Sequence, residues 1–316
     1  MFDASRERDV GDFLSVADLD AARCVALLDL ADGLKRERRR SGVARSDLLA
    51  GRTIALVFEK PSTRTRVSFH VAVAELGGNP LPLAAQELQL GRGETVADTA
   101  EVLSRYVHAL VVRTFAHDRL VELSAAATVP VVNALSDHEH PCQALADLLT
   151  IREQRGELAG TRLAYVGDGN NVAHSLLLAA ALMGMRMRLG HPPGYGPDGG
   201  VVELARQLGG DVLTTEDPVA AVQGAHVVYT DVWASMGHEA EQEQRRQRFA
   251  RYQVSAELMA QAAPDVIFLH CLPAHRGQEV TEEVIDGPAS RVLEQSENRL
   301  HTQKALLSML LGDHGS

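Results

Sequence analysis

Residues 53–66 read TIALVFEKPSTRTR, and this stretch predicts a buried strand that leads through a turn into a helix. Residues 53–58 form an apolar run of strand length. Ser62 is a favourable helix N-cap, and apolar residues continue at helical spacing from Val67 to Ala74. A strand–turn–helix unit of this kind is typical of an α/β protein.

The turn also carries the chemistry of an anion site. Arg64 and Arg66 alternate with Thr63 and Thr65 at the expected start of the helix. A helix N-terminus leaves backbone N–H groups unpaired and carries partial positive charge. Together these groups predict a site for a phosphate-like dianion. The alternative is a capped helix with surface arginines, which the strand–turn–helix context disfavours.

Composition restricts the class of protein. The chain has 316 residues, enough for about two domains, and 45% of them are hydrophobic. Aromatic residues make up only 4%, so Leu, Val and Ala must fill most of the core. The formal net charge of -11 argues against a general nucleic-acid-binding protein.

The cysteines indicate a reducing compartment. Cys24, Cys142 and Cys271 are an odd, sparse set without CxxC spacing, which predicts no disulfide framework. No Cys or His set has metal-ligand spacing, so we expect no metal site. Residues 1–10 lack an apolar signal core, and no stretch approaches membrane-spanning length without charge. We expect a soluble cytoplasmic protein that binds neither nucleic acid nor membrane.

Strand and helix patterns alternate along the chain. After an initial helix over residues 16–40, the first series has expected strands at 53–58, 81–84, 109–112 and 129–133 and helices at 67–76, 96–106 and 120–127. A long helix over 141–155 precedes a second series, with strands at 163–166, 187–189, 211–214, 227–230 and 266–269 and helices at 171–183, 201–208, 239–250 and 295–311.

This alternation predicts the fold class: an α/β protein with two domains, each a parallel sheet flanked by helices. We expect the first domain to cover residues 1–138, completed by a C-terminal helix at 295–316. The second domain should cover residues 139–294. Active sites of such proteins lie at the carboxyl ends of the strands, here in the cleft between the domains.

The tetrapeptide His140-Pro141-Cys142-Gln143 begins the long helix. Pro141 suits the first helical position, which places His140 at the N-cap and Gln143 one turn later. The imidazole and the amide can then reach one ligand, because residues three apart share a helix face. A neutral His can donate a hydrogen bond to a carbonyl oxygen. The alternative is a helix cap with an incidental His.

Three polar residues follow expected strands, Arg113 and Asp231 directly and Cys271 one residue later. Arg113, Asp231 and Cys271 each stand where a parallel sheet binds its ligands. Asp231 is suited to an ammonium group. Alternatively, Arg113 is an edge residue in a salt bridge and Cys271 a buried apolar residue.

Gly167-Asp168-Gly169-Asn170-Asn171 also follows a strand and begins a helix. It suggests a dinucleotide site, but Val172 occupies the third glycine position and no acidic residue ends the next strand at Leu189. The sequence therefore predicts no cofactor. Asn171 can still present its amide to a ligand.

Taken together, these motifs resemble the aspartate/ornithine carbamoyltransferase family over nearly the whole chain. Ser62-Thr63-Arg64-Thr65-Arg66 and His140-Pro141-x-Gln143 are similar to its carbamoyl-phosphate signatures. Asp231-x-x-x-Ser235-Met236-Gly237 and His270-Cys271-Leu272-Pro273 resemble the ornithine-type members. The aspartate-type members typically have Pro at the position of Cys271.

The resemblance implies residue roles. It implies a carbamoyl-phosphate site formed by Ser62, Thr63, Arg64, Thr65, Gln89, Arg113, His140, Gln143, Cys271, Leu272 and Arg299. It implies an ornithine site formed by Asn171, Asp231, Ser235 and Met236. The residues implied in catalysis are Arg113, His140, Asp231 and Cys271. Gln89 matches a loop residue that reaches a neighbouring subunit, so a homotrimer, or a multiple of trimers, is implied.

The implied reaction moves the carbamoyl group of carbamoyl phosphate to the side-chain amine of L-ornithine, giving L-citrulline and phosphate. One alternative is transfer to another amine: an acylated ornithine, putrescine or aspartate. Another is a non-catalytic α/β protein that binds small anions. The combination of a phosphate turn with a separate amino-acid motif favours transfer to ornithine.

Overall fold

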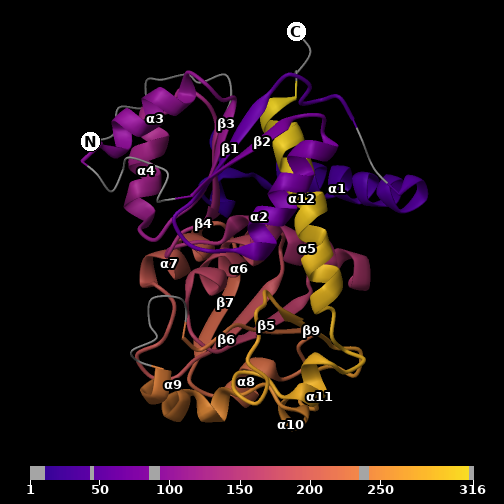
Figure 1. Ribbon diagram of the computed structural model, residues 1–316. Helices are drawn as coiled ribbons and strands as arrows, with labels where there is room; N and C mark the ends of the chain where they lie inside the picture. Colours follow the sequence, from indigo (N-terminus) through magenta and orange to yellow (C-terminus); the bar gives the residue numbers. More distant parts are fainter. Residues whose placement is uncertain (1–10, 43–45, 85–92, 235–241, 313–316) are drawn as a thin grey trace. The chain divides into compact units, whose positions relative to one another are not determined.

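A computed structural model describes residues 11–42, 46–84, 93–234 and 242–312 of the chain (Figure 1). The chain divides into two compact units. Unit 1 comprises Met1–Asp18, Ala26–Asp137 and Leu300–Ser316, and unit 2 comprises Leu19–Val25 and His138–Arg299. Two helices, α1 (Ala21–Ser41) and α12 (Val292–Leu311), contribute residues to both units.

Unit 1 contains a four-stranded parallel sheet in the order β2-β1-β3-β4. Its strands are β1 (Thr53–Phe58), β2 (Asn79–Ala84), β3 (Ala109–Arg113) and β4 (Val131–Leu135). Its helices are η1 (Val16–Asp18), α2 (Thr63–Glu75), α3 (Val96–Ser104) and α4 (His117–Ala126). The central strand β3 is buried along its whole length, as an apolar strand covered by helices on both faces should be.

The core of unit 1 follows from the alternation of side chains along β1 and β3. Ala55 and Val57 pack with Leu110 and Val112 against apolar residues of α3 and α4. Figure 1 shows these two helices together on one side of the sheet. In the register of β1 and β3, Phe58 stands opposite Arg113, so the two strands end side by side.

Unit 2 contains a five-stranded parallel sheet in the order β7-β6-β5-β8-β9. Its strands are β5 (Arg162–Val166), β6 (Arg186–Gly190), β7 (Asp211–Thr215), β8 (Val227–Thr230) and β9 (Ile267–His270). Its helices are α5 (Pro141–Arg155), α6 (Asn171–Leu182), α7 (Gly199–Gln207), α8 (Pro218–Val222), α9 (Gln242–Phe249), η5 (Ala250–Tyr252), α10 (Ala256–Met259) and α11 (Glu282–Ile285). The order changes direction at β5, so the loops after β5 and β8 diverge there and leave room for a ligand.

One face of the second sheet packs against its short helices. Ala164, Val228 and Phe268 from neighbouring strands join a buried cluster with residues of α8, α10 and α11. The three helices lie together beside the sheet in Figure 1. The expected fold class, two parallel sheets flanked by helices, is confirmed.

Two details differ from the sequence expectations. The expected helix over 16–40 is interrupted: η1 ends at Asp18, and α1 begins after Asp20, whose carboxylate accepts the Arg23 N–H at 2.7 Å. This side-chain cap ends the helical pattern and restarts it. The helices α8, α10 and α11 were not expected, because four or five residues are too few to show a helical period.

Among the described residues, no helix combines the length and the apolar character that a membrane crossing needs.

Candidate active site

The turn between β1 and α2 in unit 1 folds as the sequence predicts. Ser62 is the N-cap of α2, and its hydroxyl accepts the Thr65 N–H at 3.3 Å. Thr65 is buried, Arg64 is half-buried and Thr63 is exposed. The first helical turn thus presents hydroxyl, guanidinium and backbone N–H groups together, which suits a phosphate.

Arg113 lies at the same edge of the sheet of unit 1. It ends β3 opposite Phe58, and its carbonyl oxygen accepts the Glu59 N–H at 2.8 Å. Its side chain is buried, with 8% of its surface exposed. The structure therefore brings Arg113 to the turn that holds Ser62 and Thr65. This placement explains why a charged residue ends an otherwise apolar strand.

Sequence reasoning missed Lys60 in this turn. Its side chain is only 6% exposed, and Nζ lies 4.0 Å from the centre of the Phe115 ring. A buried ammonium over an aromatic face adds positive charge to the turn. Its position just before Pro61 and Ser62 was the available signal.

His140 and Gln143 take the predicted places at the start of α5 in unit 2. Pro141 occupies the first turn, and His140 is the N-cap residue without a side-chain capping bond. The His140 N–H instead donates to the Ser175 hydroxyl at 2.9 Å. Gln143 is 2% exposed, and its Oε1 accepts a hydrogen bond from Arg299 Nη1 at 2.6 Å. Two residues far apart in sequence, both expected at the carbamoyl-phosphate site, are thus in direct contact.

Asp231 is the centre of a second group of polar side chains in unit 2. It follows β8 directly and is 6% exposed. Cys271 Sγ donates to its Oδ1 at 3.0 Å, and Asn170 Nδ2 donates to its Oδ2 at 2.8 Å. The three residues come from the ends of β8, β9 and β5, so the sheet topology assembles them.

Asn170 is a residue that the sequence argument passed over in favour of Asn171. It is the N-cap of α6: its Oδ1 accepts the N–H groups of Val172 and Ala173 at 3.0 and 3.2 Å. This capping bond directs its Nδ2 toward Asp231. Asn171 begins α6 and is half-buried. The signal for Asn170 was its type, since Asn directly before a helix is a favoured cap.

The backbone around Cys271 is fixed by buried neighbours. Leu272 has a φ of 58°, in the left-handed region that non-glycine residues rarely adopt. Its N–H donates to His270 Nδ1 at 2.8 Å, and His270 Nε2 lies 3.4 Å from the buried carboxylate of Glu279. His270 therefore supports the loop that presents Cys271.

A salt bridge holds the loop after β5. Arg245 from α9 donates to Asp168 Oδ2 at 2.7 Å and to the Trp233 carbonyl oxygen at 2.8 Å. Gly169 in this loop passes so close to its neighbours that a Cβ would lie 2.2 Å from the Pro197 nitrogen. The glycine-rich sequence thus serves close backbone packing here.

Potential metal ligands also meet in unit 2. Among the described residues, Asp231, His270 and Cys271 offer one ligand atom each within 4.8 Å of one another. The spacing of Cys and His in the sequence does not indicate this group, because Asp231 comes from a different strand end. In the structure the Cys271 thiol donates a hydrogen bond to Asp231, and His270 Nδ1 accepts the Leu272 N–H.

Three predicted residues, Gln89, Ser235 and Met236, lie outside the described residues. Trp233, just before that segment, is buried and its ring centre lies 5.9 Å from that of Phe249. It packs in the core of unit 2.

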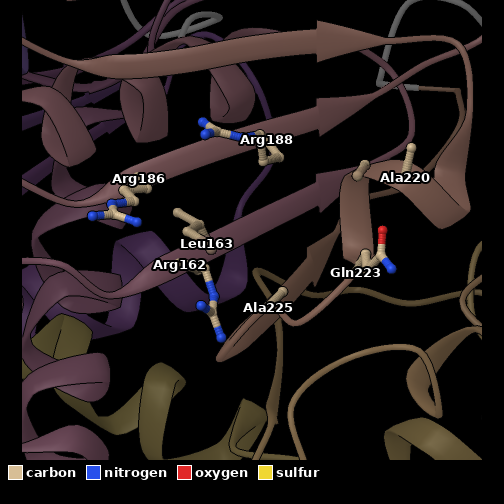
Figure 2. A pocket seen from close by; sticks show the side chains of 8 residues that line it. Arg162, Leu163, Arg186, Arg188, Ala220, Gln223 and Ala225 are labelled. Carbon is tan, nitrogen blue, oxygen red and sulfur yellow. The ribbon is translucent and has the colours of Figure 1, made fainter.

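A pocket of about 150 Å³ lies at the other end of the second sheet, where the strands begin (Figure 2). Arg162, Arg186 and Arg188 line it, and in Figure 2 their side chains spread apart. Arg188 Nη1 is paired with Asp211 at 2.7 Å, and Arg162 Nε donates to the Gly224 carbonyl oxygen. These guanidinium groups do not converge on one ligand, so the pocket is not part of the candidate site.

Two family models match successive parts of the chain. Residues 11–153 match the carbamoyl-P binding domain of aspartate/ornithine carbamoyltransferase, and residues 159–310 match the Asp/Orn binding domain. The chain belongs to the aspartate/ornithine carbamoyltransferase family. Both groups of polar side chains described above lie within these matches.

Relatives within the family match almost the full length. An ornithine carbamoyltransferase from Parafrankia sp. is 59% identical over 305 residues, which are 95% of this chain and 96% of the relative. One from Methanothermobacter thermautotrophicus is 56% identical over 304 residues, or 95% and 98% of the two chains. The solved structure of ornithine carbamoyltransferase from Pyrococcus furiosus has a TM-score of 0.92 and 51% identity, covering 96% of this chain and 98% of the other.

Proposed function

We propose that the protein is an ornithine carbamoyltransferase, which transfers the carbamoyl group of carbamoyl phosphate to the side-chain amine of L-ornithine. The observation that carries the proposal is the cluster at Asp231. The Asp231 carboxylate accepts hydrogen bonds from Cys271 and Asn170, and it can bind the ammonium group of an amino-acid acceptor. The full-length similarity to ornithine carbamoyltransferases supports the same acceptor.

Carbamoyl phosphate would be held first by the turn of unit 1. Ser62, Thr63 and Thr65 supply hydroxyl and backbone donors at the helix N-terminus, and Arg64 supplies a guanidinium for the phosphate. As the bond to phosphate breaks, these groups stabilise the charge that accumulates on the leaving group.

The carbamoyl end would be bound by Arg113, His140, Gln143 and Arg299, with the backbone at Cys271 and Leu272. Donors directed at the carbonyl oxygen stabilise the negative charge that develops when the amine attacks. The contact of Arg299 with Gln143 supports this assignment, because it fixes the amide before substrate arrives. A site fixed in this way needs little reorganisation during the reaction.

Ornithine would bind by its α-ammonium group at Asp231, assisted by Asn171, Ser235 and Met236. Cys271 donates to the same carboxylate and would help to direct the reacting amine at the carbamoyl carbon. Holding both reactants in this geometry supplies much of the rate acceleration. No covalent intermediate on Cys271 is needed.

The reacting amine of ornithine resembles that of lysine, with an ordinary pKa of about 10. Only its neutral form attacks. We therefore expect kcat/KM for ornithine to rise about tenfold per pH unit over the neutral range, until the bound amine is neutral.

The experiment is a product assay with the purified full chain. Carbamoyl phosphate and L-ornithine should give L-citrulline and inorganic phosphate in equal amounts. Carbamoyl-phosphate binding without citrulline would instead favour a non-catalytic anion-binding protein and contradict the proposal.

A homotrimer, or a multiple of trimers, in the cytoplasm belongs to the same proposal. It is supported by family membership, by the match of Gln89 to a subunit-bridging residue, and by three cysteines that form no disulfide among the described residues. Light scattering of the purified chain should give three times the chain mass of 34.1 kDa, or a multiple of that value.

A further inference from the structure

Asp147 is a fully buried carboxylate that the proposed reaction does not use. It lies on α5, one turn after Gln143, with 0% of its surface exposed. Its Oδ1 accepts two hydrogen bonds, from Gln143 Nε2 at 2.8 Å and from Gln295 Nε2 at 2.7 Å. One oxygen atom thus binds two amides that come from α5 and α12.

The orientation of both amides follows from chemistry. The guanidinium group of Arg299 and the backbone N–H of His270 can only donate hydrogen bonds, so each must face an amide oxygen. Gln143 Oε1 accepts from Arg299 Nη1 at 2.6 Å, and Gln295 Oε1 accepts the His270 N–H at 2.9 Å. The remaining end of each amide is its NH₂ group, which requires an acceptor. Asp147 supplies that acceptor to both.

The network reaches both halves of the candidate site in unit 2. Through Gln143 it fixes Arg299, which belongs to the proposed carbamoyl-phosphate site. Through Gln295 it fixes the backbone of His270, the residue directly before Cys271. Gln295 Nε2 also donates to the Tyr229 hydroxyl at 3.1 Å, two residues before Asp231.

We propose that Asp147 is a positioning residue that orients the Gln143 amide for carbamoyl phosphate and, through Gln295, the Cys271 loop for the amine acceptor. This inference rests on the proposed function. Asp147 acts as a hydrogen-bond acceptor, and its charge is not required. An uncharged carboxyl or an amide oxygen at the same place can accept both bonds.

The surroundings agree with that distinction. Burial raises the pKa of Asp147 to about 7, although Gln143, Gln295, Arg299 and Tyr229 lower it. No donor among the described residues reaches its Oδ2. Arg299 from α12, Tyr229 from β8, and the thiols of Cys142 and Cys271 are the other ionisable groups of this network. The carboxyl group is therefore poised to work with or without its proton.

The test compares Asp147→Leu, which has similar volume and no acceptor, with Asp147→Asn, which keeps one oxygen acceptor. The wild-type chain is assayed first, because absence of citrulline there would contradict the proposed function and not this inference. Thr150→Val is the matched control: Thr150 is buried on the same helix and accepts from Asn298 at 2.9 Å, outside the Asp147 network. Thermal unfolding and circular dichroism give the folded fraction of each variant.

Asp147→Leu should weaken carbamoyl-phosphate binding about 10- to 100-fold per folded molecule, because Gln143 loses its acceptor. Asp147→Asn should stay within about threefold of wild type, as should Thr150→Val. Wild-type binding by folded Asp147→Leu would overturn the inference. So would an equal loss in Asp147→Asn, since the charge itself would then be required.

Double substitutions provide a second test if Asp147→Leu is too unstable to purify. In a Gln143→Ala background, Asp147→Asn and Asp147→Ala should bind carbamoyl phosphate within about threefold of Gln143→Ala alone. Losses that multiply would show that Asp147 does not act through Gln143. Gln295→Met tests the other branch: it should raise KM for ornithine about tenfold and weaken carbamoyl-phosphate binding less than Asp147→Leu does, because Gln143 keeps its acceptor. The reverse pattern would overturn that branch.

Discussion

The two groups of candidate residues are built differently. In unit 1 they come from one continuous strand–turn–helix segment, joined by Arg113 from the next strand. In unit 2 they come from the ends of several strands and from two helices, and their side chains form hydrogen bonds with one another. Asp231 meets Cys271 and Asn170, and Gln143 meets Arg299.

The difference indicates what each group has to do. A phosphate dianion is recognised by a helix N-terminus and guanidinium groups, which one short segment can supply. An amino acid and a carbamoyl group need several polar atoms at defined angles, which only converging loops can supply. Substitutions in unit 1 should therefore weaken the binding of carbamoyl phosphate strongly. Substitutions in unit 2 should weaken the binding of either substrate, or lower the turnover that requires both.

The largest effect is expected at the turn of unit 1. Arg64→Ala should lower kcat/KM for carbamoyl phosphate about 1,000-fold while the fold is retained, because a charge-assisted bond to the phosphate is lost. Arg105→Ala, an exposed arginine elsewhere in the unit, is the control and should keep full activity. Unchanged steady-state kinetics of Arg64→Ala would remove this turn from the site.

The next effect is expected at Asp231. Asp231→Ala should raise KM for ornithine about 100-fold and change KM for carbamoyl phosphate little, because the ammonium group loses its counter-charge. Asp265→Ala is the control, since that carboxylate is mostly exposed and paired with Arg155. Equal changes in both KM values would contradict the division between a donor side and an acceptor side.

A smaller effect concerns stability and pH. The pKa of Asp147 is raised from 3.8 to about 7, so the folded state holds a proton that the unfolded chain releases. The protonated Asp147 contributes its full share of the free energy of unfolding below pH 3.8, the pKa of Asp in the unfolded chain. That contribution is lost as pH rises through about 7, the pKa in the folded state. Asn does not titrate. The free energy of unfolding of Asp147→Asn, relative to that of the wild type, should therefore rise by about 2 kcal/mol between pH 5 and pH 7.

Chemical denaturation at several pH values measures that difference. The corresponding difference for Thr150→Val should not depend on pH. A flat difference for Asp147→Asn would mean that Asp147 is ionised throughout this range.

The smallest effect is expected at Cys271. Cys271→Ala should lower kcat about tenfold and leave carbamoyl-phosphate binding intact, because one bond to Asp231 is lost while the loop is still held by His270. Cys24→Ala, a buried thiol whose pKa burial raises to about 12, is the control. Complete loss of turnover in folded Cys271→Ala would instead indicate a covalent role for the thiol.

The sequence was sufficient where the signal is local. The strand over 53–58, the cap at Ser62 and the proline-led start of α5 were predicted because each depends on neighbouring residues only. The parallel sheets followed from alternation along the chain.

Residues whose role depends on distant partners were missed or misplaced. Asp147 stands among apolar residues of α5; its spacing from Gln143 allows a hydrogen bond on one helix face, but its second partner, Gln295, is 148 residues away in the sequence. Asn170 was passed over because its neighbour Asn171 matched the family pattern. Lys60 lacks a sequence signal for its contact with Phe115, which comes from another strand's loop.

The most direct test of the account is an acceptor competition. Isotope-labelled carbamoyl phosphate is incubated with the purified chain and equal concentrations of L-ornithine, L-aspartate, putrescine and N-acetyl-L-ornithine, and the carbamoylated products are separated and counted. Nearly all of the label should enter L-citrulline, and Asp231→Ala should remove this preference. Label in carbamoyl-aspartate or carbamoyl-putrescine, or no labelled product, would contradict it.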